Sequence, residues 1–478
     1  MARTTKERPR EGGAPPGPNG AAAGAGIGVF GATMLVMGNM IGSGVFTLPS
    51  NLAKYGVVSI IGWLVTGIGA LFLALVFSRL ARGIPRTGGP YAYSKAAFGD
   101  FMGFWIAWGY WIAVWAGNAA IAISCVGYIG YFVPFLQRNN AVSTLCAIGL
   151  VWLLSCINAY GVKQGSLVTN ITAVVKLAVL VGIGVVGIIL ADWGNFEWNP
   201  SGVSFFVALG STLTLTLWAF IGLESATVPA GDVKDPDRTI PLSTVVGTLG
   251  ALGVYVIGTI AVMGSVPLDE LSKSAFPFAE AARNMFGSTG GTIVAIGAII
   301  GTFGALNGWI LLQGQVPFAA ANDKVFPKRF AAVSRHNVPI FGLIVSSLLI
   351  TILMLIQLPG GKGVASLFEV IILIATFCTI IPYVFSAGAQ LFFLATDRAH
   401  FSGRRFGIDM TIAVLAFLYT LYAVYGAGFE YVTYGLILLL VGIPVYMWVR
   451  WKKPAPADWR SAEPSPHAGP ERIEGGGA

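Results

Sequence analysis

The stretch MGNMIGSGVF, residues 37 to 46, interrupts the first long apolar segment of the chain with three glycines and a serine. Glycine costs about 1 kcal/mol per residue in a helix interior relative to alanine. Non-helical backbone at membrane depth is tolerated only where it is buried in protein or lines a cavity. The stretch therefore predicts a membrane-spanning helix that is broken near its middle, although small residues alone would also fit close packing between helices.

The composition of the whole chain is that of a polytopic membrane protein. Its 478 residues are 55% hydrophobic and only 10% charged, and the mean hydropathy is +0.75. A soluble domain has about 25% charged residues. The formal net charge of +8 comes from short loops and tails, so it does not indicate nucleic-acid binding. No phosphate-binding G-x-x-x-x-G-K-[ST] motif is present in the sequence, so we expect no nucleotide.

Cysteine and histidine give no sign of a metal site, a cofactor or catalysis. The cysteines lack paired or metal-ligand spacing and fit a packing role. The histidines fall in expected loops or in the tail, and no nucleophile and base share an expected cavity. We therefore expect no cofactor and no enzymatic activity. The residues concerned are Cys125, Cys146, Cys156, Cys378, His336, His400 and His467.

Apolar runs long enough to cross a bilayer recur along nearly the whole chain. Two tails, 1–25 and 452–478, lack a hydrophobic pattern and are expected to be disordered. Between them we predict an all-α membrane domain of twelve transmembrane helices. The expected spans are 27–54, 57–82, 91–135 (with an interfacial piece), 140–159, 165–191, 202–230, 241–266, 289–320, 339–358, 364–394, 407–427 and 430–450.

The basic residues of the loops predict the orientation of these spans. One side collects most of them, and the opposite loops carry only scattered basic residues. Twelve spans with both termini in the cytoplasm fit this alternation. The first side has Arg3, Lys6, Arg8, Arg10, Arg82, Arg86, Lys95, Lys163, Lys234, Arg238, Lys324, Lys328, Arg329, Arg335, Arg398, Arg404, Arg405, Arg450, Lys452 and Lys453; the other has Arg138, Lys273, Arg283 and Lys362.

A second interrupted span lies five spans after the first. It contains TLWAFIGLESATVPAGD, residues 216 to 232, with Gly222 and Glu224 near its middle. Two broken helices in corresponding positions are the signature of an inverted-repeat transporter. We therefore expect one repeat at 26–193 and a second at 202–394, followed by two further helices at 405–451.

Broken helices expose half-helix ends, which suit a zwitterion. Free N–H groups attract an anion and free carbonyls attract a cation. Ser43 and Gly44 are expected to receive an α-carboxylate. The α-ammonium is expected at carbonyls near Met40, Ile41, Trp218, Ala219 and Ile221.

Five stretches resemble a known family: GNMIGSGVFTLPSNLA, GGPYAYSKAAFG, YWIAVWAGN, TLWAFIGLESATVPAGDVKDP and GALNGWILLQGQVPFAAANDKVFP. The chain resembles the amino acid–polyamine–organocation transporters over about 27–450, and among them the bacterial arginine/agmatine antiporter. Similarity to the ornithine/putrescine and lysine/cadaverine antiporters is also expected. The resemblance implies a LeuT-like fold of five plus five helices, with a homodimer as the expected assembly.

The resemblance also assigns residues to substrate binding. Trp218 matches a tryptophan that closes over the substrate from outside, and Trp309 matches one that stacks on its side chain. The third span places Tyr110, Ala113, Val114 and Asn118 on one helical face. In the relative, the matching asparagine bonds the guanidinium. The chain departs from the arginine antiporter at Met40, Val114, Ile121 and Ala375, which makes this end of the pocket more apolar.

Four ionisable or phenolic residues have expected roles in gating or coupling. Glu224 is expected near mid-membrane, where carboxylates are expensive and usually functional; the resemblance places it in an inner gate with Tyr110 and Trp309. Tyr91 matches a tyrosine linked to acid sensitivity, or is an interfacial anchor. By resemblance to transporters of the wider family, Lys176 is either a fixed substitute for a sodium ion or a group that couples import to protons; the alternative is a lysine that snorkels to a helix end. Glu369, at an outer helix end, is either a vestibule residue that attracts cations or a solvated side chain, and the second interpretation is favoured.

These features favour an antiporter of the bacterial inner membrane. It would exchange arginine, lysine or ornithine for the decarboxylated amine or another amino acid by alternating access. The alternative is a proton-coupled importer of amino acids or polyamines, which Lys176 and Glu224 motivate.

Overall fold

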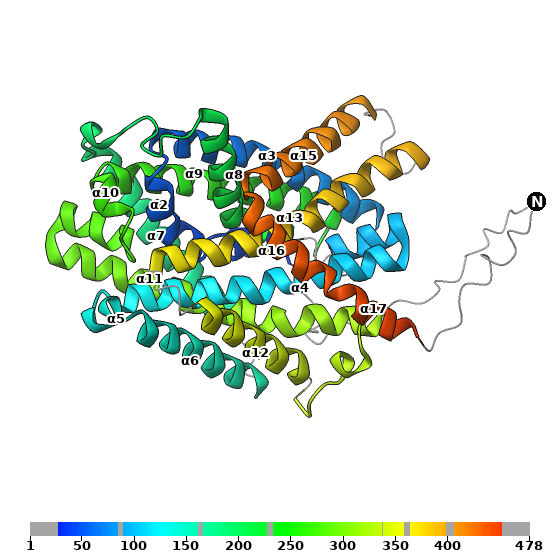
Figure 1. Ribbon diagram of the computed structural model, residues 1–478. Helices are drawn as coiled ribbons and strands as arrows, with labels where there is room; N and C mark the ends of the chain where they lie inside the picture. The colour runs from blue at the N-terminus through cyan, green and yellow to red at the C-terminus, as the bar shows by residue number, and fades with distance from the viewer. Residues whose placement is uncertain are drawn as a thin grey trace, which may run out of the picture.

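The computed structural model describes residues 27–84, 89–160, 166–226, 233–336, 338–357, 364–397 and 406–451. The two tails expected to be disordered, 1–25 and 452–478, lie outside these residues. Within the described ranges the chain forms helices and no β-strand, with one isolated bridge between Ile27 and Val233. Figure 1 shows the helices running roughly alongside one another as a bundle. The all-α architecture expected from the sequence is confirmed.

The helices follow the expected spans closely. The first half holds α1 (Val29–Met40), α2 (Ser43–Ala53), α3 (Val57–Gly83), α4 (Pro90–Ile129), α5 (Pro134–Arg138), α6 (Asn140–Ala159) and α7 (Ser166–Ile189). The rest holds α8 (Phe205–Phe220), the 3₁₀ turn η2 (Leu223–Ala226), α9 (Pro236–Met263), α10 (Leu268–Leu271), α11 (Pro277–Asn322), α12 (Ile340–Gln357), α13 (Val364–Thr396), α15 (Phe406–Gly426), α16 (Phe429–Leu440) and α17 (Gly442–Arg450). Short 3₁₀ turns at Trp193–Asn195 and Lys328–Ala331 complete the described helices.

The number of membrane spans is close to the twelve expected. Nine helices in the described part are long and apolar enough to cross a membrane, and the bent pair α1–α2 makes a tenth. Two shorter apolar helices, Val174–Ile189 and Phe205–Phe220, lie at the fifth and sixth expected positions. The chain is thus a multi-pass membrane protein, and twelve spans stays a prediction.

Two pairs of breaks recur five spans apart, as an inverted repeat requires. The first pair interrupts the first and sixth spans: α2 is bent by 42° from α1, and α8 ends before Gly222, whose φ is 107°. The second pair lies near the starts of α4 and α11, at Gly99 (φ 83°) and Gly287 (φ 71°). Glycine adopts such positive φ values without the penalty that a side chain brings.

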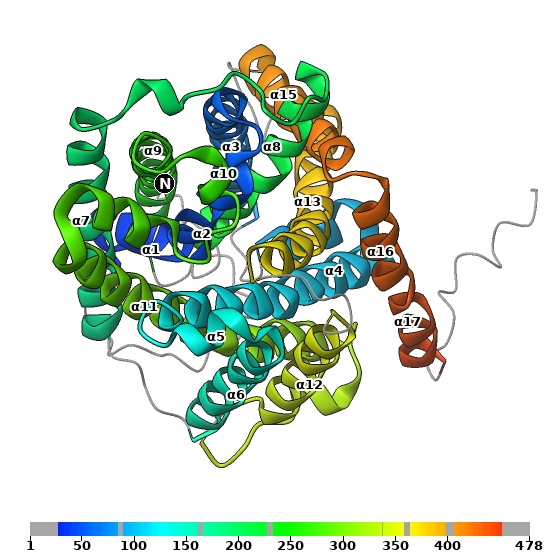
Figure 2. The same cartoon turned by 60° about the vertical axis from the view of Figure 1, so that its left-hand side comes forward.

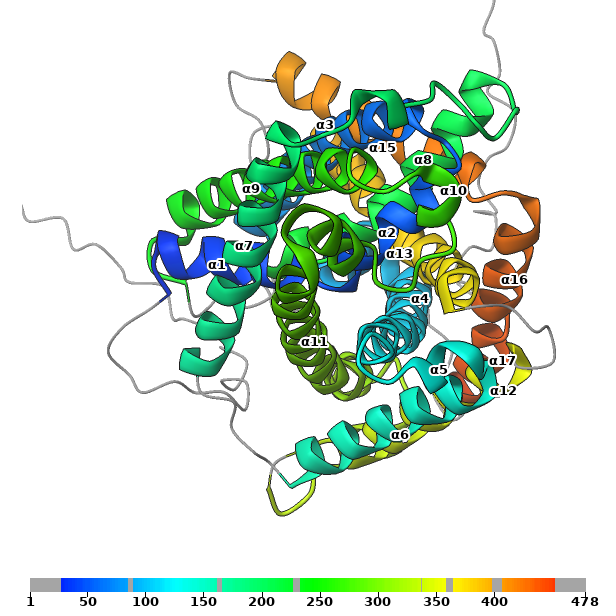
Figure 3. The same ribbon diagram turned by 90° about the vertical axis from the view of Figure 1, so that its left-hand side faces the viewer.

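The broken helices lie inside the bundle. Figures 2 and 3 show α1 and α2 among α7, α9 and α11, whereas α6 and α12 run side by side along one flank. Every residue of α2 is buried. The outer helices instead expose large apolar side chains, as a lipid-facing surface does. Among these exposed side chains are Leu145, Val185, Ile356, Leu418 and Ile437.

Candidate substrate site

A cavity lies where the two broken spans meet the long helices. Among the described residues, no charged side chain lines it. The lining residues are Asn39, Met40, Gly42, Ser43, Gly44, Tyr110, Ala113, Val114, Gly117, Ile121, Trp218, Ile221, Trp309 and Thr379.

Most of the residues that the sequence proposed for binding reach this cavity, and four do not line it. Ile41 and Ala219 are buried beside it, and Ala375 lies one turn before Thr379. Asn118 is also fully buried, and its Nδ2 donates to Gln313 Oε1 at 2.8 Å. The binding roles of these residues, like those of the residues that line the cavity, stay predictions.

Four further residues line the cavity that were not expected from the sequence: Asn39, Gly42, Gly117 and Thr379. Gly117 could have been found, because positions 110, 113, 114, 117 and 121 follow the spacing of one helical face. Thr379 could not, since only the packing of α13 against α4 brings it to the cavity.

One end of the cavity is the N-terminus of α2. Ser43 is the first residue of this helix, and its Oγ is buried with no hydrogen-bond partner among the described residues. The first N–H groups of a helix also lack partners within the helix and attract negative charge. This end of the cavity therefore offers several donors to an anionic group such as a carboxylate.

Three of the carbonyls at the breaks that the α-ammonium is expected to meet already accept hydrogen bonds within the protein. Ala219 O accepts one from Tyr255 Oη at 2.7 Å, Met40 O one from Gly42 N at 3.0 Å, and Trp218 O one from Ile221 N at 3.3 Å. A carbonyl oxygen has two lone pairs, so each can still accept from a ligand. Gly38 O accepts from Lys176 Nζ at 2.7 Å. The break therefore has carbonyl oxygens that can accept from a ligand, and beside them the ammonium of Lys176 held on Gly38 O.

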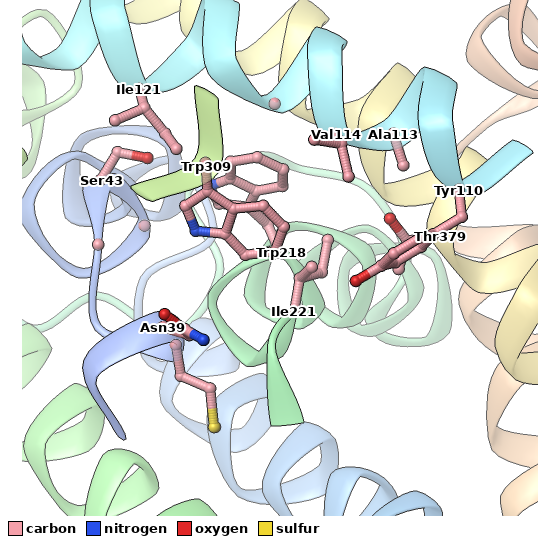
Figure 4. Close-up of a pocket in the computed structure, with 14 residues that line it drawn as sticks. Asn39, Ser43, Tyr110, Ala113, Val114, Ile121, Trp218, Ile221, Trp309 and Thr379 are labelled. Atoms are coloured by element: carbon pink, nitrogen blue, oxygen red, sulfur yellow. The ribbon is translucent and has the colours of Figure 1, made fainter. Parts of the chain in front are cut away.

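Two indole rings occupy the middle of the cavity. Figure 4 shows Trp218 and Trp309 projecting between the Ser43 end and the Tyr110–Thr379 end. A cation over an indole face gains about 0.5–1 kcal/mol when exposed and about 2 kcal/mol when desolvated. The cavity can therefore hold a cationic group without an acidic partner.

Gly117 sets the position of the Trp218 ring. A Cβ on Gly117 would lie 2.7 Å from Trp218 Cη2, so any side chain there must displace the indole. Extra methylenes in a packed interior cost about 1–3 kcal/mol. We expect Gly117→Ala to raise the KM for transported substrate about ten-fold, measured as uptake into proteoliposomes.

The matched control for this variant is Gly149→Ala on α6, where a Cβ would have no described heavy atom within 4 Å. It should leave the KM unchanged. Equal KM values for wild type and Gly117→Ala would show that the position of the Trp218 ring does not affect substrate binding.

Glu224 is held by three donors directly behind the cavity. Its carboxylate accepts from Tyr110 Oη at 2.8 Å, from Tyr383 Oη at 2.7 Å and from the N–H of Gly222 at 3.2 Å. The side chain is 1% exposed. Tyr110 is expected from the sequence, whereas Tyr383 of α13 is not. The carboxylate thus joins α4, α13 and the break after α8.

Lys176 reaches from α7 to the end of α1. Besides its bond to Gly38 O, its stem lies next to Gly301 of α11, where a Cβ would meet Lys176 Cβ at 3.4 Å. The residue is 5% exposed, so the snorkelling alternative does not describe it. The ammonium therefore connects three helices beside the break, and its role in coupling stays a prediction.

Tyr91 lies away from the cavity, in a polar cluster at the ends of α4 and α11. Its Oη donates to Asp323 Oδ2 at 2.7 Å, and Lys95 Nζ lies 3.9 Å from both Asp323 and Asp100. Arg450 at the end of α17 pairs with Asp100. The role of Tyr91 in acid sensitivity stays a prediction.

Glu369 is not freely solvated, which corrects the interpretation made from the sequence. Its side chain is 22% exposed, and Oε1 pairs with Lys54 Nζ at 2.7 Å. Oε2 also accepts from Asn51 Nδ2 at 3.3 Å. The correction arises because α2 and α13, distant in sequence, meet at this end of the bundle.

Known proteins resemble this chain over most of its length. A family model for amino acid permeases matches residues 27–445. The putrescine transporter PotE of Haemophilus influenzae is 32% identical over 428 residues, which cover 89% of this chain and 97% of that protein. The cadaverine/lysine antiporter of Escherichia coli K12 is 35% identical over 408 residues, 84% of this chain and 90% of the other.

The fold also has a solved counterpart. The crystal structure of the manganese transporter of Eremococcus coleocola, in complex with an aromatic bis-isothiourea substituted compound, aligns with a TM-score of 0.58. The alignment covers 88% of this chain and 94% of that one at 13% identity, which is a likeness of fold alone.

Two broken helices around a cavity, in a multi-pass bundle, define a membrane transporter of the inverted-repeat class. The chain belongs to the amino acid permease family, which confirms the resemblance seen in its motifs. It is therefore a transporter and not an enzyme.

Proposed function

We propose that the protein is an antiporter that exchanges a basic amino acid for a diamine. The observation that carries the proposal is the cavity itself, which has helix N–H groups and the unpartnered Ser43 hydroxyl at one end and two indole rings in its middle. The relatives that are named for putrescine and for cadaverine and lysine support this substrate class. An amino acid and its decarboxylated amine share the distal cation, so one set of indole and oxygen contacts serves both.

Thr379 adds an acceptor at the far end of the cavity. Its Oγ1 donates to Ala375 O at 3.0 Å, which leaves the lone pairs of the hydroxyl oxygen for a ligand donor. With Trp309 alongside, this end suits an ammonium or a guanidinium. Lysine with cadaverine and ornithine with putrescine are the first pairs to test, and arginine with agmatine is the third.

Counterflow in proteoliposomes tests the proposal. Vesicles that contain the purified protein are loaded with one unlabelled amine or amino acid, and uptake of labelled lysine, ornithine or arginine is followed. Exchange requires uptake to depend on the internal substrate. Uptake into empty vesicles that occurs only under an imposed proton gradient would favour the second candidate, a proton-coupled importer. The observation that supports the proton-coupled importer is the ammonium of Lys176, which donates to Gly38 O beside the break.

Trp309→Leu should reduce transport of a diamine about ten-fold, because the leucine side chain has no π-face for the cation. Trp309→Phe should retain part of the activity, since a phenyl face keeps a weaker cation–π contact. Uptake at several substrate concentrations gives KM and kcat for both variants.

The exposed Trp198 lies outside the cavity and provides the control, Trp198→Leu. Wild-type kinetics in Trp309→Leu would show that Trp309 does not contribute to substrate binding.

We also propose that the protein lies in the bacterial inner membrane as a homodimer, with both termini in the cytoplasm. The basic loops support this orientation, and the resemblance to dimeric antiporters supports the assembly. A C-terminal reporter that is active only in the cytoplasm tests the first point, and light scattering of the purified protein tests the second.

A further inference from the structure

A chain of buried amides and hydroxyls crosses from α4 through α11 to α12. Asn118 Nδ2 donates to Gln313 Oε1 at 2.8 Å, and Gln313 Nε2 lies 3.0 Å from Ser347 Oγ and 3.4 Å from Leu343 O. Ser347 Oγ in turn contacts Ser155 Oγ at 2.8 Å. Asn118, Gln313 and Ser347 are all fully buried.

The direction of these hydrogen bonds is fixed from the α12 end. Ser347 Oγ has one proton, for which Leu343 O at 2.9 Å and Ser155 Oγ at 2.8 Å are acceptors, so it accepts from Gln313. Leu343 O is a backbone carbonyl, which also only accepts. The group of Gln313 that faces these two acceptors must therefore be its NH₂, and Oε1 must face α4.

This direction determines which end of the Asn118 amide is free. Because Gln313 presents an acceptor, Asn118 must turn its NH₂ toward it. Asn118 Oδ1 is then left buried, and it accepts no hydrogen bond from the described residues. A buried acceptor without a partner costs about 1–3 kcal/mol. That cost is removed when a donor arrives.

The free oxygen belongs to a residue that does not itself line the substrate cavity but lies on α4 between residues that do. Asn118 follows Val114 by four positions and precedes Ile121 by three, so it shares a helical face with two lining residues. Gln313 follows Trp309 by four positions on α11 and lies on the same face as that indole. Asn118 and Gln313 thus each lie one helical turn from a lining residue, Val114 and Trp309 respectively.

We infer that Gln313 is a positioning residue for substrate selection: it locks the Asn118 amide so that its oxygen, and not its NH₂, meets the substrate. The site then favours side chains that end in a hydrogen-bond donor, such as ammonium or guanidinium, over apolar chains of equal length. This inference rests on the proposed function, because it concerns the selectivity of that same cavity.

The test is the selectivity of transport for lysine over norleucine, which has nearly the same length and lacks the terminal donor. Inhibition of labelled putrescine uptake by each amino acid gives the ratio. Gln313→Met keeps the volume but removes the acceptor, which frees the Asn118 amide to rotate. We expect the ratio to fall about ten-fold, which is the effect of one hydrogen bond to a charged group. The fall should come mainly from weaker inhibition by lysine.

Two more variants separate positioning from general loosening of the fold. Gln313→Glu, in its protonated form, can still accept from Asn118 and donate toward Ser347, so it should keep the ratio near that of the wild type. Gln390→Met replaces another fully buried glutamine on α13 and should leave the ratio unchanged. If Gln313→Met does not fold, Ser347→Ala removes one of the two acceptors that orient Gln313 and should lower the ratio two- to three-fold.

The outcomes distinguish this inference from the proposed function. An unchanged ratio in Gln313→Met, or in Ser347→Ala if that variant is the one that folds, overturns the positioning role while wild-type exchange of lysine for a diamine still stands. An equal loss in Gln390→Met also overturns it. If the wild type transports no amine or basic amino acid, the proposed function itself fails. Asn118→Ala should weaken inhibition by lysine more than inhibition by norleucine. Equal losses for the two amino acids would show that Asn118 has a structural role.

Discussion

Replacing Lys176 with methionine should reduce exchange more than ten-fold and remove any dependence of transport on pH that this ammonium causes. The wild-type side chain donates to Gly38 O at 2.7 Å while only 5% exposed. Hydrogen bonds to charged groups contribute about 1.5–3 kcal/mol, and about 1.4 kcal/mol is a factor of ten in an equilibrium constant. The variant loses the cation that holds the end of α1 against α7. Initial rates of uptake from pH 5 to 9 measure both effects.

The exposed Lys273 provides the control for a change from lysine to methionine. Lys273→Met should keep both the rate and the pH profile of the wild type. An active Lys176→Met variant with an unchanged pH profile would exclude Lys176 from coupling. An active variant that loses only the pH dependence would favour the proton-coupled importer over the exchanger.

Glu224→Gln should lower exchange ten- to a hundred-fold and destabilise the protein by about 2–4 kcal/mol. The carboxylate accepts from two phenols and one backbone N–H, which are bonds to a charged group. A glutamine has one oxygen instead of two, and its NH₂ would face a donor. Exchange rates, together with thermal unfolding of the purified protein, measure the two effects.

A matched control lies on the surface. Tyr434 Oη donates to Glu430 at 3.1 Å on exposed α16, so Glu430→Gln changes the same pair of groups in contact with solvent. It should have little effect, because exposed polar contacts contribute little. Tyr383→Phe should lose part of the activity that Glu224→Gln loses. Full activity in Glu224→Gln would show that the carboxylate takes no part in gating.

The sequence predicted the broken spans correctly because their cause is local. Glycines at 38, 42, 44 and 222 weaken a helix wherever they occur, and a lipid environment leaves few places for such a break. The lining face of α4 was predictable for a similar reason, since the spacing of Tyr110, Ala113 and Val114 follows from helix geometry alone.

The sequence could not predict contacts between helices that are distant along the chain. Glu369 was interpreted as solvated because nothing near it in sequence pairs with it, yet Lys54 lies 315 positions away and forms its ion pair. Tyr383 and Gln313 were missed because a tyrosine or glutamine in an apolar span has many packing roles. The hydrogen-bond partners of such a residue can be identified only from the side chains that other helices pack against it.

The sequence by itself thus determined the membrane class, the two broken spans, the family and most of the residues that line the cavity. These depend on composition, local periodicity and motifs, which are properties of a single segment. The tertiary structure decided which donors satisfy Glu224, what covers Lys176 and which way the Asn118 amide faces. A buried polar group takes its hydrogen bonds from whatever packs against it, and in a helical bundle those groups come from other helices.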